Sequence, residues 1–335
     1  MSKKTIMVFG ATGTLGTYFV DHLVEQGYNI WAIGRRNVNA VYYSNKGVKC
    51  AKVDITKKED FNQLPQSGID SVVLISGAMP SRMEGYKPQL YIDVNISGTL
   101  NVLEYCRKAK VDSFLFTQSH SDVAGYWNTG EVIKADAKRR LNLKGDHAVY
   151  IISKNAAVDL AEHYHQDYGL RTFVFRLPTV YNYRPIYEMY VNGKNAPIGY
   201  RYFIQKALNS ETIEIWGDPN SAKDIVYVKD FNQLLSKAIE SDKEKGIYNV
   251  ASGIPTTLEE QIRGVVEVFS PKDNPSPILY KPEKPSQNSY LYDIENAKKE
   301  LGYQPQYSYK EMLLDMRKEM NGDRFAHLEG FNVNI

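Results

Sequence analysis

The stretch that decides the fold reads IMVFGATGTLG, residues 6–16. Its apolar start, Ile6 to Phe9, is typical of a strand that is buried on both faces. Glycines follow at positions 10, 13 and 16, and residues 15–26 then carry the apolar spacing of an amphipathic helix. In a strand, loop and helix of this kind the first glycine permits a tight turn, the second lets a pyrophosphate approach the backbone, and the third lets the helix pack on the strand. The helix start also offers free N–H groups to an anion, so the stretch predicts a dinucleotide-binding loop.

The alternation of strands and helices continues through the first half of the chain. Further strand candidates lie at 30–33, 48–53, 72–75, 114–117 and 172–177, and further helical patterns at 95–108 and 156–168. This spacing predicts an α/β fold with right-handed βαβ units and a Rossmann-type, doubly wound parallel sheet. Turn-forming residues become frequent after about residue 178, where we expect a smaller α+β lobe with helices at 200–209, 230–241, 257–268 and 308–320. The predicted domains are therefore a cofactor domain, residues 1–178, and a substrate-binding lobe, residues 179–335, partly interleaved with it.

The composition excludes several classes of protein. The 335 residues include 41 basic and 39 acidic side chains, and this net charge of +2 gives no sign of a surface for nucleic acid. The two cysteines, Cys50 and Cys106, cannot build a disulfide framework, and no metal-ligand spacing is visible. No apolar run approaches the roughly 18 to 20 residues that span a bilayer, and no targeting segment is apparent. We therefore expect a cytoplasmic enzyme with no metal site and no membrane partner.

The end of the second strand bears on the identity of the cofactor. In dinucleotide-binding folds an acid about 20 residues after the glycine loop binds the adenosine 2′-hydroxyl, whereas an arginine accommodates a 2′-phosphate. Here the strand runs into Gly34, Arg35 and Arg36 without an acid, which favours NADP(H) over NAD(H). Asp54, at the end of the third strand, is placed to bond the adenine amino group.

A tyrosine and a lysine four residues apart on a helix are the candidate proton-transfer groups. A nearby ammonium lowers the pKa of a phenol, ordinarily about 10, because it stabilises the phenolate. Among 25 tyrosines the pattern Tyr-x-x-x-Lys occurs five times, at Tyr42, Tyr150, Tyr190, Tyr202 and Tyr280. Only Tyr150 and Lys154 open a long helical run that leads into a strand of the predicted sheet, so we interpret them as the catalytic pair.

Polar residues also crowd the end of the fifth strand, which reads TQSHSD, residues 117–122. A hydroxyl at this edge of the sheet could bond the reacting oxygen and share its proton with Tyr150. Ser119 is the first choice and Ser121 the second, whereas His120 is interpreted as incidental.

Together these features resemble the extended short-chain dehydrogenase/reductases, the NAD-dependent epimerase/dehydratase family. Further segments carry the resemblance: 95–103, 176–181, 215–218, 223–230, 248–251, and 293 with 301–305. The resemblance implies that Tyr150 is the acid/base, that Lys154 lowers its pKa and holds the nicotinamide ribose, and that Ser119 binds the sugar oxygen. It implies hydride transfer at C4 of a nucleotide-diphosphate sugar. It also implies a homodimer through helices at about 95–109 and 150–168.

The same resemblance implies two sets of binding residues. The cofactor set is Gly10, Thr12, Gly13, Thr14, Leu15, Gly16, Arg35, Arg36, Asp54, Ile55, Ser76, Gly77, Ala78, Asn95, Thr117, Tyr150, Lys154, Leu177, Pro178 and Val180. The substrate set is Ser119, Ser121, Thr179, Asn182, Trp216 and Lys223.

The net reaction stays open at the level of sequence. Family members usually carry asparagine, glycine and arginine where this chain has Thr179, Asn182 and Lys223. The first interpretation is an epimerase. The alternatives are a 4,6-dehydratase, for which Asp122 is the evident extra acid, a 4-keto-sugar reductase, which would fit NADP(H), and a non-sugar NADP-dependent carbonyl reductase.

Overall fold

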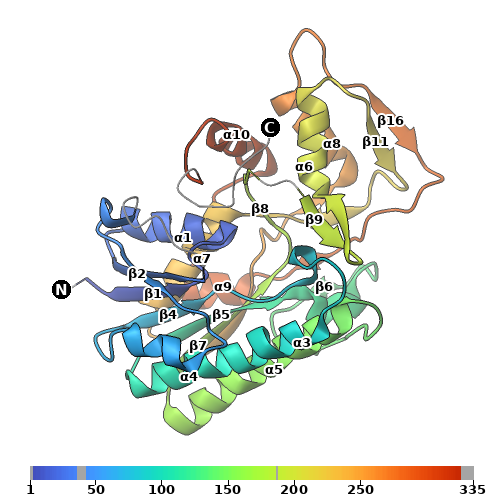
Figure 1. Ribbon diagram of the computed structural model, residues 1–335. Helices are drawn as coiled ribbons and strands as arrows, with labels where there is room; N and C mark the ends of the chain where they lie inside the picture. Colours follow the sequence, from blue (N-terminus) through green and yellow to red (C-terminus); the bar gives the residue numbers. More distant parts are fainter. Residues whose placement is uncertain (1–2, 36–42, 186–187, 326–335) are drawn as a thin grey trace.

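A seven-stranded parallel sheet forms the centre of the molecule (Figure 1). The computed structural model describes residues 3–35, 43–185 and 188–325. Across the sheet the strands run in the order β3-β2-β1-β4-β5-β7-β14, so the chain starts in the middle and winds outward in both directions. Their bounds are β1 Thr5–Phe9, β2 Asn29–Gly34, β3 Lys49–Lys52, β4 Ser71–Leu74, β5 Ser113–Ser119, β7 Arg171–Leu177 and β14 Lys245–Asn249.

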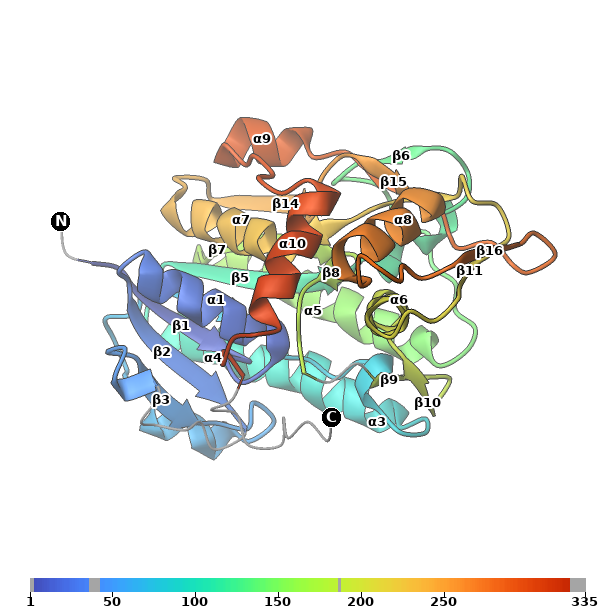
Figure 2. The same cartoon turned by 90° about the horizontal axis from the view of Figure 1, so that it is seen from above.

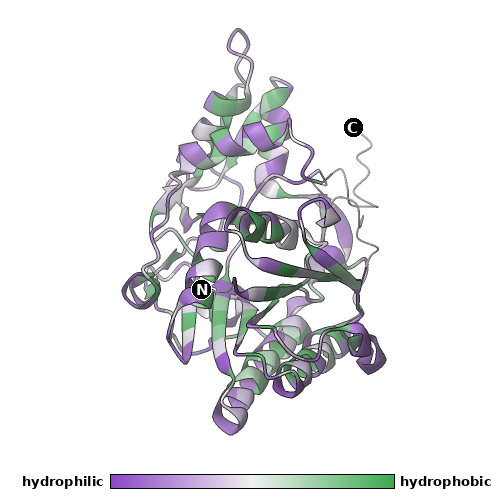
Figure 3. Cartoon of the chain, turned by 90° about the vertical axis from the view of Figure 1, so that its left-hand side faces the viewer, coloured by the Kyte–Doolittle hydropathy of each residue, from purple (hydrophilic) through white to green (hydrophobic). Residues whose placement is uncertain are grey.

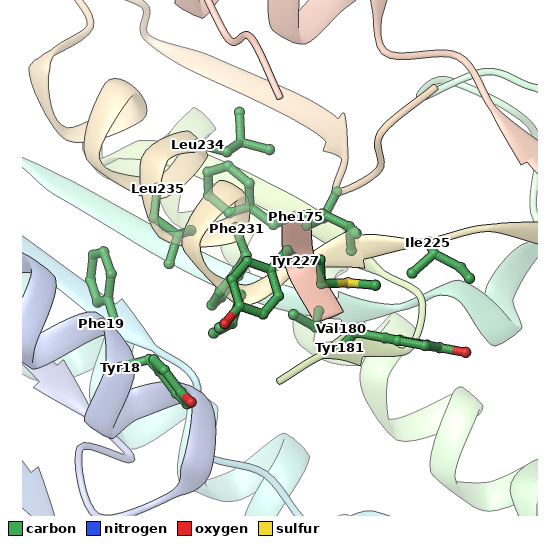
Figure 4. Close-up of a cluster of buried hydrophobic side chains, with 14 of the residues drawn as sticks. Tyr18, Phe19, Phe175, Val180, Tyr181, Ile225, Tyr227, Phe231, Leu234 and Leu235 are labelled. Atoms are coloured by element: carbon green, nitrogen blue, oxygen red, sulfur yellow. The ribbon is translucent and has the colours of Figure 1, made fainter. Parts of the chain in front are cut away.

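Helices cover both faces of the sheet (Figures 1 and 2). On one side lie α1 (Thr14–Glu25) and α7 (Val228–Glu240), and on the other lie α4 (Gly98–Lys108) and α5 (His147–Tyr168). Because successive strand residues point to opposite faces, Val8 joins the core cluster of the first side and Phe9 that of the second. Figure 4 shows part of the first cluster, where α7 packs beside α1. In Figure 3 the helices carry both hydrophobic and hydrophilic residues.

A second lobe stands beside the sheet and carries α6, α8, β11 and β16 (Figure 1). Its small strand pairs are β9 with β10, β11 with β16 and β12 with β15, while β8 pairs with β13 and β6 with β17. The helices and turns not yet named are α3 Pro88–Tyr91, α6 Gly199–Leu208, α8 Leu258–Phe269, α9 Glu295–Leu301 and α10 Tyr309–Glu319, with 3-10 turns at Lys58–Gln63, Pro80–Arg82 and His120–Tyr126 and a π-helix at Ile92–Ser97. The remaining strands are β6 Val132–Ile133, β8 Val180–Tyr181, β9 Glu188–Val191, β10 Lys194–Pro197, β11 Ile213–Trp216, β12 Ala222–Asp224, β13 Val226–Tyr227, β15 Pro255–Thr257, β16 Ile278–Lys281 and β17 Leu291–Tyr292.

The predicted doubly wound sheet is confirmed, and all six predicted strands are present. The seventh strand, β14, was not predicted, because it reads KGIYN and lies at the edge of the sheet, where a strand needs no continuous apolar run. Since β14 pairs with β7, the second half of the chain returns to complete the first domain's sheet.

Two helices differ from prediction in ways that matter for the site. Helix α5 begins at His147, before the predicted start at residue 156, so Tyr150 and Lys154 lie on one continuous helix. The helix expected from residue 95 begins instead as a π-helix, Ile92–Ser97, and continues as α4. Both α4 and α5 expose apolar side chains, Leu100 and Ile152, but the homodimer through these helices stays a prediction. None of the described helices combines the length and the apolar character that crossing a membrane requires.

The loop between β1 and α1 packs so tightly on the first turn of α1 that Gly10 in the loop and Gly16 in the helix leave no room for a side chain. A Cβ atom on Gly10, whose φ is +96°, would lie 2.7 Å from the backbone nitrogen of Ser76 after β4. A Cβ atom on Gly16 would lie 2.0 Å from the carbonyl oxygen of Gly10. The loop therefore lies directly against both the helix and the neighbouring strand end, as the glycine pattern predicts.

This packing predicts that the glycines at 16 and 13 respond differently to alanine. Gly16→Ala forces a backbone shift, and we expect it to lower the free energy of unfolding by roughly 2 to 4 kcal/mol. Gly13→Ala is the matched control, because its Cβ atom would meet only the Gly10 carbonyl oxygen, at 3.2 Å. We expect a change within about 1 kcal/mol for that variant. Urea denaturation of the cofactor-free proteins measures both values, and equal losses would contradict the packing argument.

Candidate active site

A cleft of about 1050 Å³ opens at the carboxyl edge of the sheet. Its walls come from the loops that follow β1, β2, β3, β4, β5 and β7, and from α5 and the second lobe. Ligands of open α/β sheets bind at this edge, where the strand order reverses. The cleft lining includes nearly all the residues that sequence reasoning proposed: Gly10, Thr12, Gly13, Thr14, Leu15, Gly16, Arg35, Asp54, Ile55, Ser76, Gly77, Ala78, Thr117, Ser119, Ser121, Tyr150, Lys154, Leu177, Pro178, Thr179, Val180 and Asn182.

The glycine-loop end of the cleft has the donors that a pyrophosphate needs. Helix α1 starts at Thr14 with no side-chain cap, so the N–H groups of its first turn have no partner within the helix. The Thr14 hydroxyl and the Ser76 hydroxyl are buried without a hydrogen-bond partner among the described residues. Buried hydroxyls normally have a partner. The tight loop and these two donors therefore fit the diphosphate of a dinucleotide.

The adenosine end of the cleft carries Arg35 and Asp54. Asp54 accepts hydrogen bonds at Oδ1 from the backbone and hydroxyl of Thr56, at 3.0 and 2.8 Å. Burial acts to raise the pKa of Asp54, but the Thr56 hydrogen bonds and the charge of Arg35 outweigh it and lower the pKa. Asp54 is therefore an anion at neutral pH, able to accept a further hydrogen bond at this end. Arg36 lies outside the described residues.

Ser119, Tyr150 and Lys154 meet at the other end of the cleft. Ser119 closes β5, and its Oγ accepts a hydrogen bond from the backbone of Ser121 at 3.2 Å. Tyr150 and Lys154 project from one face of α5, one turn apart. Burial raises the pKa of the Tyr150 phenol, and Ser119 opposes this rise. Of the two serines proposed for this position, Ser119 is the one that acts on the tyrosine in this way.

Asn95 does not line the cleft, contrary to the simplest interpretation of its motif. From the π-helix its amide accepts from the backbone N–H of Ala78 at 2.8 Å and donates to the Ala78 carbonyl at 3.0 Å. It also donates to the Ser153 hydroxyl of α5 at 2.9 Å. Asn95 therefore ties the loop after β4 to α5.

Two residues of the proposed substrate set, Trp216 and Lys223, are also absent from the cleft lining. Trp216 is exposed at the end of β11 and donates to Glu214 at 2.7 Å. Lys223, on β12, lies near the buried ring of His120, and burial lowers the pKa of Lys223 to about 8. A substrate role for either residue is thus not supported by the shape of the cleft.

His120 lines the cleft but is not a proton donor at neutral pH. Burial, together with the charges of Arg176 and Lys223, lowers the pKa of His120 to about 3. Its Nδ1 atom lies 2.9 Å from the Tyr292 hydroxyl, and its ring packs on Trp127. The interpretation of His120 as incidental to proton transfer fits this environment.

Asp122, the acid that a dehydratase would need, is engaged elsewhere. Its carboxylate receives three hydrogen bonds from the Arg176 guanidinium, at 2.9, 3.1 and 3.0 Å, and both side chains are buried. The same guanidinium donates to the carbonyl of Ala135 and to Asn249. Asp122 therefore joins the strand ends of β5, β7 and β14 and does not line the cleft.

Several residues that line the cleft were missed by sequence reasoning. Examples are Arg82, Gln118, His147, Arg184, Glu188, Met189, Tyr190 and Tyr200. Most lie in turns or in the second lobe, where no periodicity marks them. Gln118 carried a usable signal, because an amide at an inward position of an apolar strand needs a buried partner.

Comparison with known proteins places the chain in a family. The model of the NAD dependent epimerase/dehydratase family matches residues 6–251, most of the chain. The chain belongs to that family. Among the curated relatives, a UDP-glucuronate 4-epimerase from Thermodesulfobacterium geofontis is 26% identical over 324 residues, which span 92% of this chain and 93% of the relative.

Solved structures share the fold of this family member. The UDP-glucose 4-epimerase of Thermotoga maritima, solved with UDP-glucose, has a TM-score of 0.75 at 22% identity and covers 95% of this chain and all of its own. The UDP-glucose 4-epimerase of Thermus thermophilus, a complex with NAD, has a TM-score of 0.73 at 22% identity, with coverage of 95% and 99%. At these identities the likeness establishes the fold.

In this member of the family Lys154, the lysine predicted to be catalytic, is buried and forms no ion pair with any described residue. Lys154 is 5% exposed, and its Nζ lies 4.0 Å from the ring centre of Phe116. Burial lowers its pKa from 10.5 to about 7. Burial likewise raises the pKa of Tyr150, against the opposing effect of Ser119.

The buried ammonium predicts a pH-dependent gain in stability when it is removed. Between pH 7 and 10.5 the unfolded chain binds more protons at Lys154 than the folded one, so wild-type stability rises with pH through that window. Lys154→Met removes the cost of burying the ammonium. We expect the free energy of unfolding of the cofactor-free protein at pH 7 to rise by roughly 2 to 4 kcal/mol. The gain should shrink as the pH approaches about 10. Denaturant titrations at several pH values measure it, with exposed Lys138→Met as the control, and a variant less stable than wild type at pH 7 would refute the argument.

Proposed function

We propose that the protein is a nucleotide-sugar 4-epimerase that uses a bound nicotinamide dinucleotide. The observation that carries this proposal is the convergence of Ser119, Tyr150 and Lys154 at one end of a cleft whose other end is a pyrophosphate loop. Proton transfer at a secondary hydroxyl needs no further acid. Dehydration needs one, and Asp122 is held by Arg176 outside the cleft. The site therefore supports epimerisation better than loss of water.

The cofactor would be held along the carboxyl edge of the sheet. The loop from Gly10 to Gly16 would take its diphosphate, and Asp54 the adenine. Lys154 would bond the nicotinamide ribose, because its buried ammonium lies at the cleft and has no carboxylate partner among the described residues. When bound, the dinucleotide supplies the acceptor and then the donor of the C4 hydride.

The chain's own side chains handle the proton. Tyr150 takes the proton of the C4 hydroxyl as the sugar is oxidised, and it returns that proton when the ketone is reduced. Ser119 bonds the same oxygen and orients it toward the tyrosine. Burial raises the pKa of Tyr150, so its anionic form depends on positive charge that arrives with the ligands. Inversion at C4 requires reduction from the opposite face of the carbonyl, and the large cleft gives the sugar room to turn.

The names of relatives support a nucleotide-sugar substrate. The curated relative is named for UDP-glucuronate, and the solved structures are named for UDP-glucose. These names agree on a UDP-sugar and on reaction at C4 but differ in the sugar. We therefore propose a UDP-hexose or UDP-hexuronate substrate.

We also infer that the adenosine end accepts the 2′-phosphate of NADP. Arg35 lines this end, and the described acid there, Asp54, is the one we assign to the adenine. A guanidinium recognises phosphate by charge and by fork geometry. The family name and the Thermus thermophilus complex point instead to NAD, so the identity of the cofactor is a separate question from the reaction.

One experiment addresses both questions. We expect the purified protein to release a dinucleotide on denaturation, identified by mass spectrometry, and to interconvert a UDP-sugar and its C4 epimer without net consumption of cofactor. Release of NAD would contradict the assignment of Arg35 but leave the epimerase proposal intact. Steady consumption of added NADPH with a 4-keto sugar would favour a reductase and contradict the epimerase proposal.

The role of Tyr150 has its own test. Tyr150→Phe keeps the packing of the ring on Tyr91 and removes the hydroxyl, so we expect normal stability and bound cofactor. Turnover should fall by at least about a hundredfold, the scale for loss of an acid/base. The control is Tyr280→Phe, whose hydroxyl lies outside the cleft on β16. Wild-type turnover in Tyr150→Phe would refute the assignment.

A further inference from the structure

Directly behind Ser119 lies a buried amide that the proposed reaction does not use. Gln118 is 4% exposed and precedes Ser119 in β5. The inward positions before it are Phe114 and Phe116, which pack in the core layer between the sheet and α5. The alternation of the strand therefore places Gln118 on the side of the catalytic helix.

Both ends of the Gln118 amide are held. Its Oε1 accepts the backbone N–H of Ser119 at 2.8 Å, and its Nε2 donates to Oδ1 of Asn155 at 2.8 Å. Asn155 is 5% exposed and follows Lys154 in α5. Two hydrogen bonds in series thus join the backbone of Ser119 to the helix that carries Tyr150 and Lys154.

This link acts at the point where the catalytic groups must be kept in register. The Ser119 Oγ accepts a hydrogen bond from the backbone N–H of Ser121, which restricts rotation of the Ser119 side chain. The Gln118 amide restricts the Ser119 backbone through a second hydrogen bond. On the outer side of the helix, Arg139 donates to the Asn155 carbonyl and pairs with Asp159. The pair of Gln118 and Asn155 is therefore anchored at both the strand and the helix.

Stability does not explain the presence of this pair. The Asn155 Nδ2 is buried and has no hydrogen-bond partner among the described residues. An unsatisfied buried donor costs free energy, and two apolar side chains of similar shape would avoid that cost. Gln118 also borders a small open pocket of about 100 Å³, which Asp122 and Arg176 line as well. A polar pair kept under these conditions points to a role in geometry.

We propose that Gln118, with Asn155, is a positioning residue that holds the Ser119 hydroxyl against Tyr150. The effect on turnover rests on the proposed function, whereas the contact between Ser119 and Tyr150 does not. Burial raises the pKa of Tyr150 and Ser119 opposes that rise, so displacement of Ser119 by loss of the link raises the pKa further. The base form of the tyrosine then appears at higher pH.

The test is a double-mutant cycle of Gln118→Leu and Asn155→Leu. We expect Gln118→Leu to lower kcat about tenfold through misplacement of Ser119, with KM changed by less than about twofold. In the pH profile of kcat, the rise that reports ionisation of Tyr150 should move to higher pH. Asn155→Leu should have a smaller effect in the same direction. The double variant should equal Gln118→Leu alone, because the two residues act as one unit.

A second measurement does not depend on turnover. In protein labelled with ¹³C at tyrosine Cζ, the Tyr150 resonance is identified from its loss in Tyr150→Phe. Gln118→Leu should move it in the same direction as Ser119→Ala does. If the wild-type protein converts no nucleotide sugar, the proposed function fails, and this resonance still decides the role of Gln118.

The control for general destabilisation is Gln261→Leu. Gln261 lies in α8, away from the cleft lining, and is also buried. Its amide donates to the carbonyl of Thr256, just before the helix, at 2.9 Å. The Gln261→Leu variant should have a lower melting temperature but an unchanged kcat and an unchanged Tyr150 resonance. An unmoved Tyr150 resonance in Gln118→Leu, or a kcat within about twofold of wild type in a protein that is active, would overturn the proposal.

Discussion

The close contact between the first loop and the neighbouring strand end is the constraint on which the rest of the structure depends. Gly10 lies so near Ser76 that a Cβ atom would collide with its backbone, and a Cβ atom on Gly16 would lie even nearer to the carbonyl oxygen of Gly10. This contact sits where the strand order reverses, between β1 and β4. It allows α1 to point its N-terminus into the crevice, so the same packing that closes the fold creates the anion site. A side chain at either position would separate the layers and remove the site.

The catalytic end depends on a second alignment, that of β5 with α5. Ser119 ends the strand, and Tyr150 lies in the first turn of the helix, so neither is placed by a loop of its own. Two buried amides span the gap between these elements: Gln118 reaches α5 directly, and Asn95 ties α5 to the loop after β4. Rigid elements locked by side-chain hydrogen bonds hold reacting groups more closely than loops do. The polar residues of this layer therefore support the geometry of the site as well as the core.

The charged and polar groups near the cleft divide into those that are paired and those that await a ligand. Asp122 and Arg176 satisfy each other and join three strand ends, which removes the carboxylate from chemistry. Lys154 is buried without an ion pair, and the hydroxyls of Thr14 and Ser76 are buried without a hydrogen bond, in the part of the chain that the structure describes. Buried polar groups of the second kind are costly in the protein alone. They mark the places where cofactor and substrate complete the hydrogen bonding of the fold.

The sequence alone determined the parallel sheet, the glycine loop and the Tyr150/Lys154 pair, because each is encoded locally by a hydrophobic period or by spacing along one helix. It also ranked Ser119 above Ser121. The sequence could not show that β14 pairs at the edge of the sheet or that Asn95 bonds the loop after β4. Nor could it show that Asp122 forms a buried ion pair with Arg176. Those facts join residues that are far apart in the chain, 17 positions for Asn95 and 54 for Asp122. Only tertiary packing decides which distant partner a buried polar group meets.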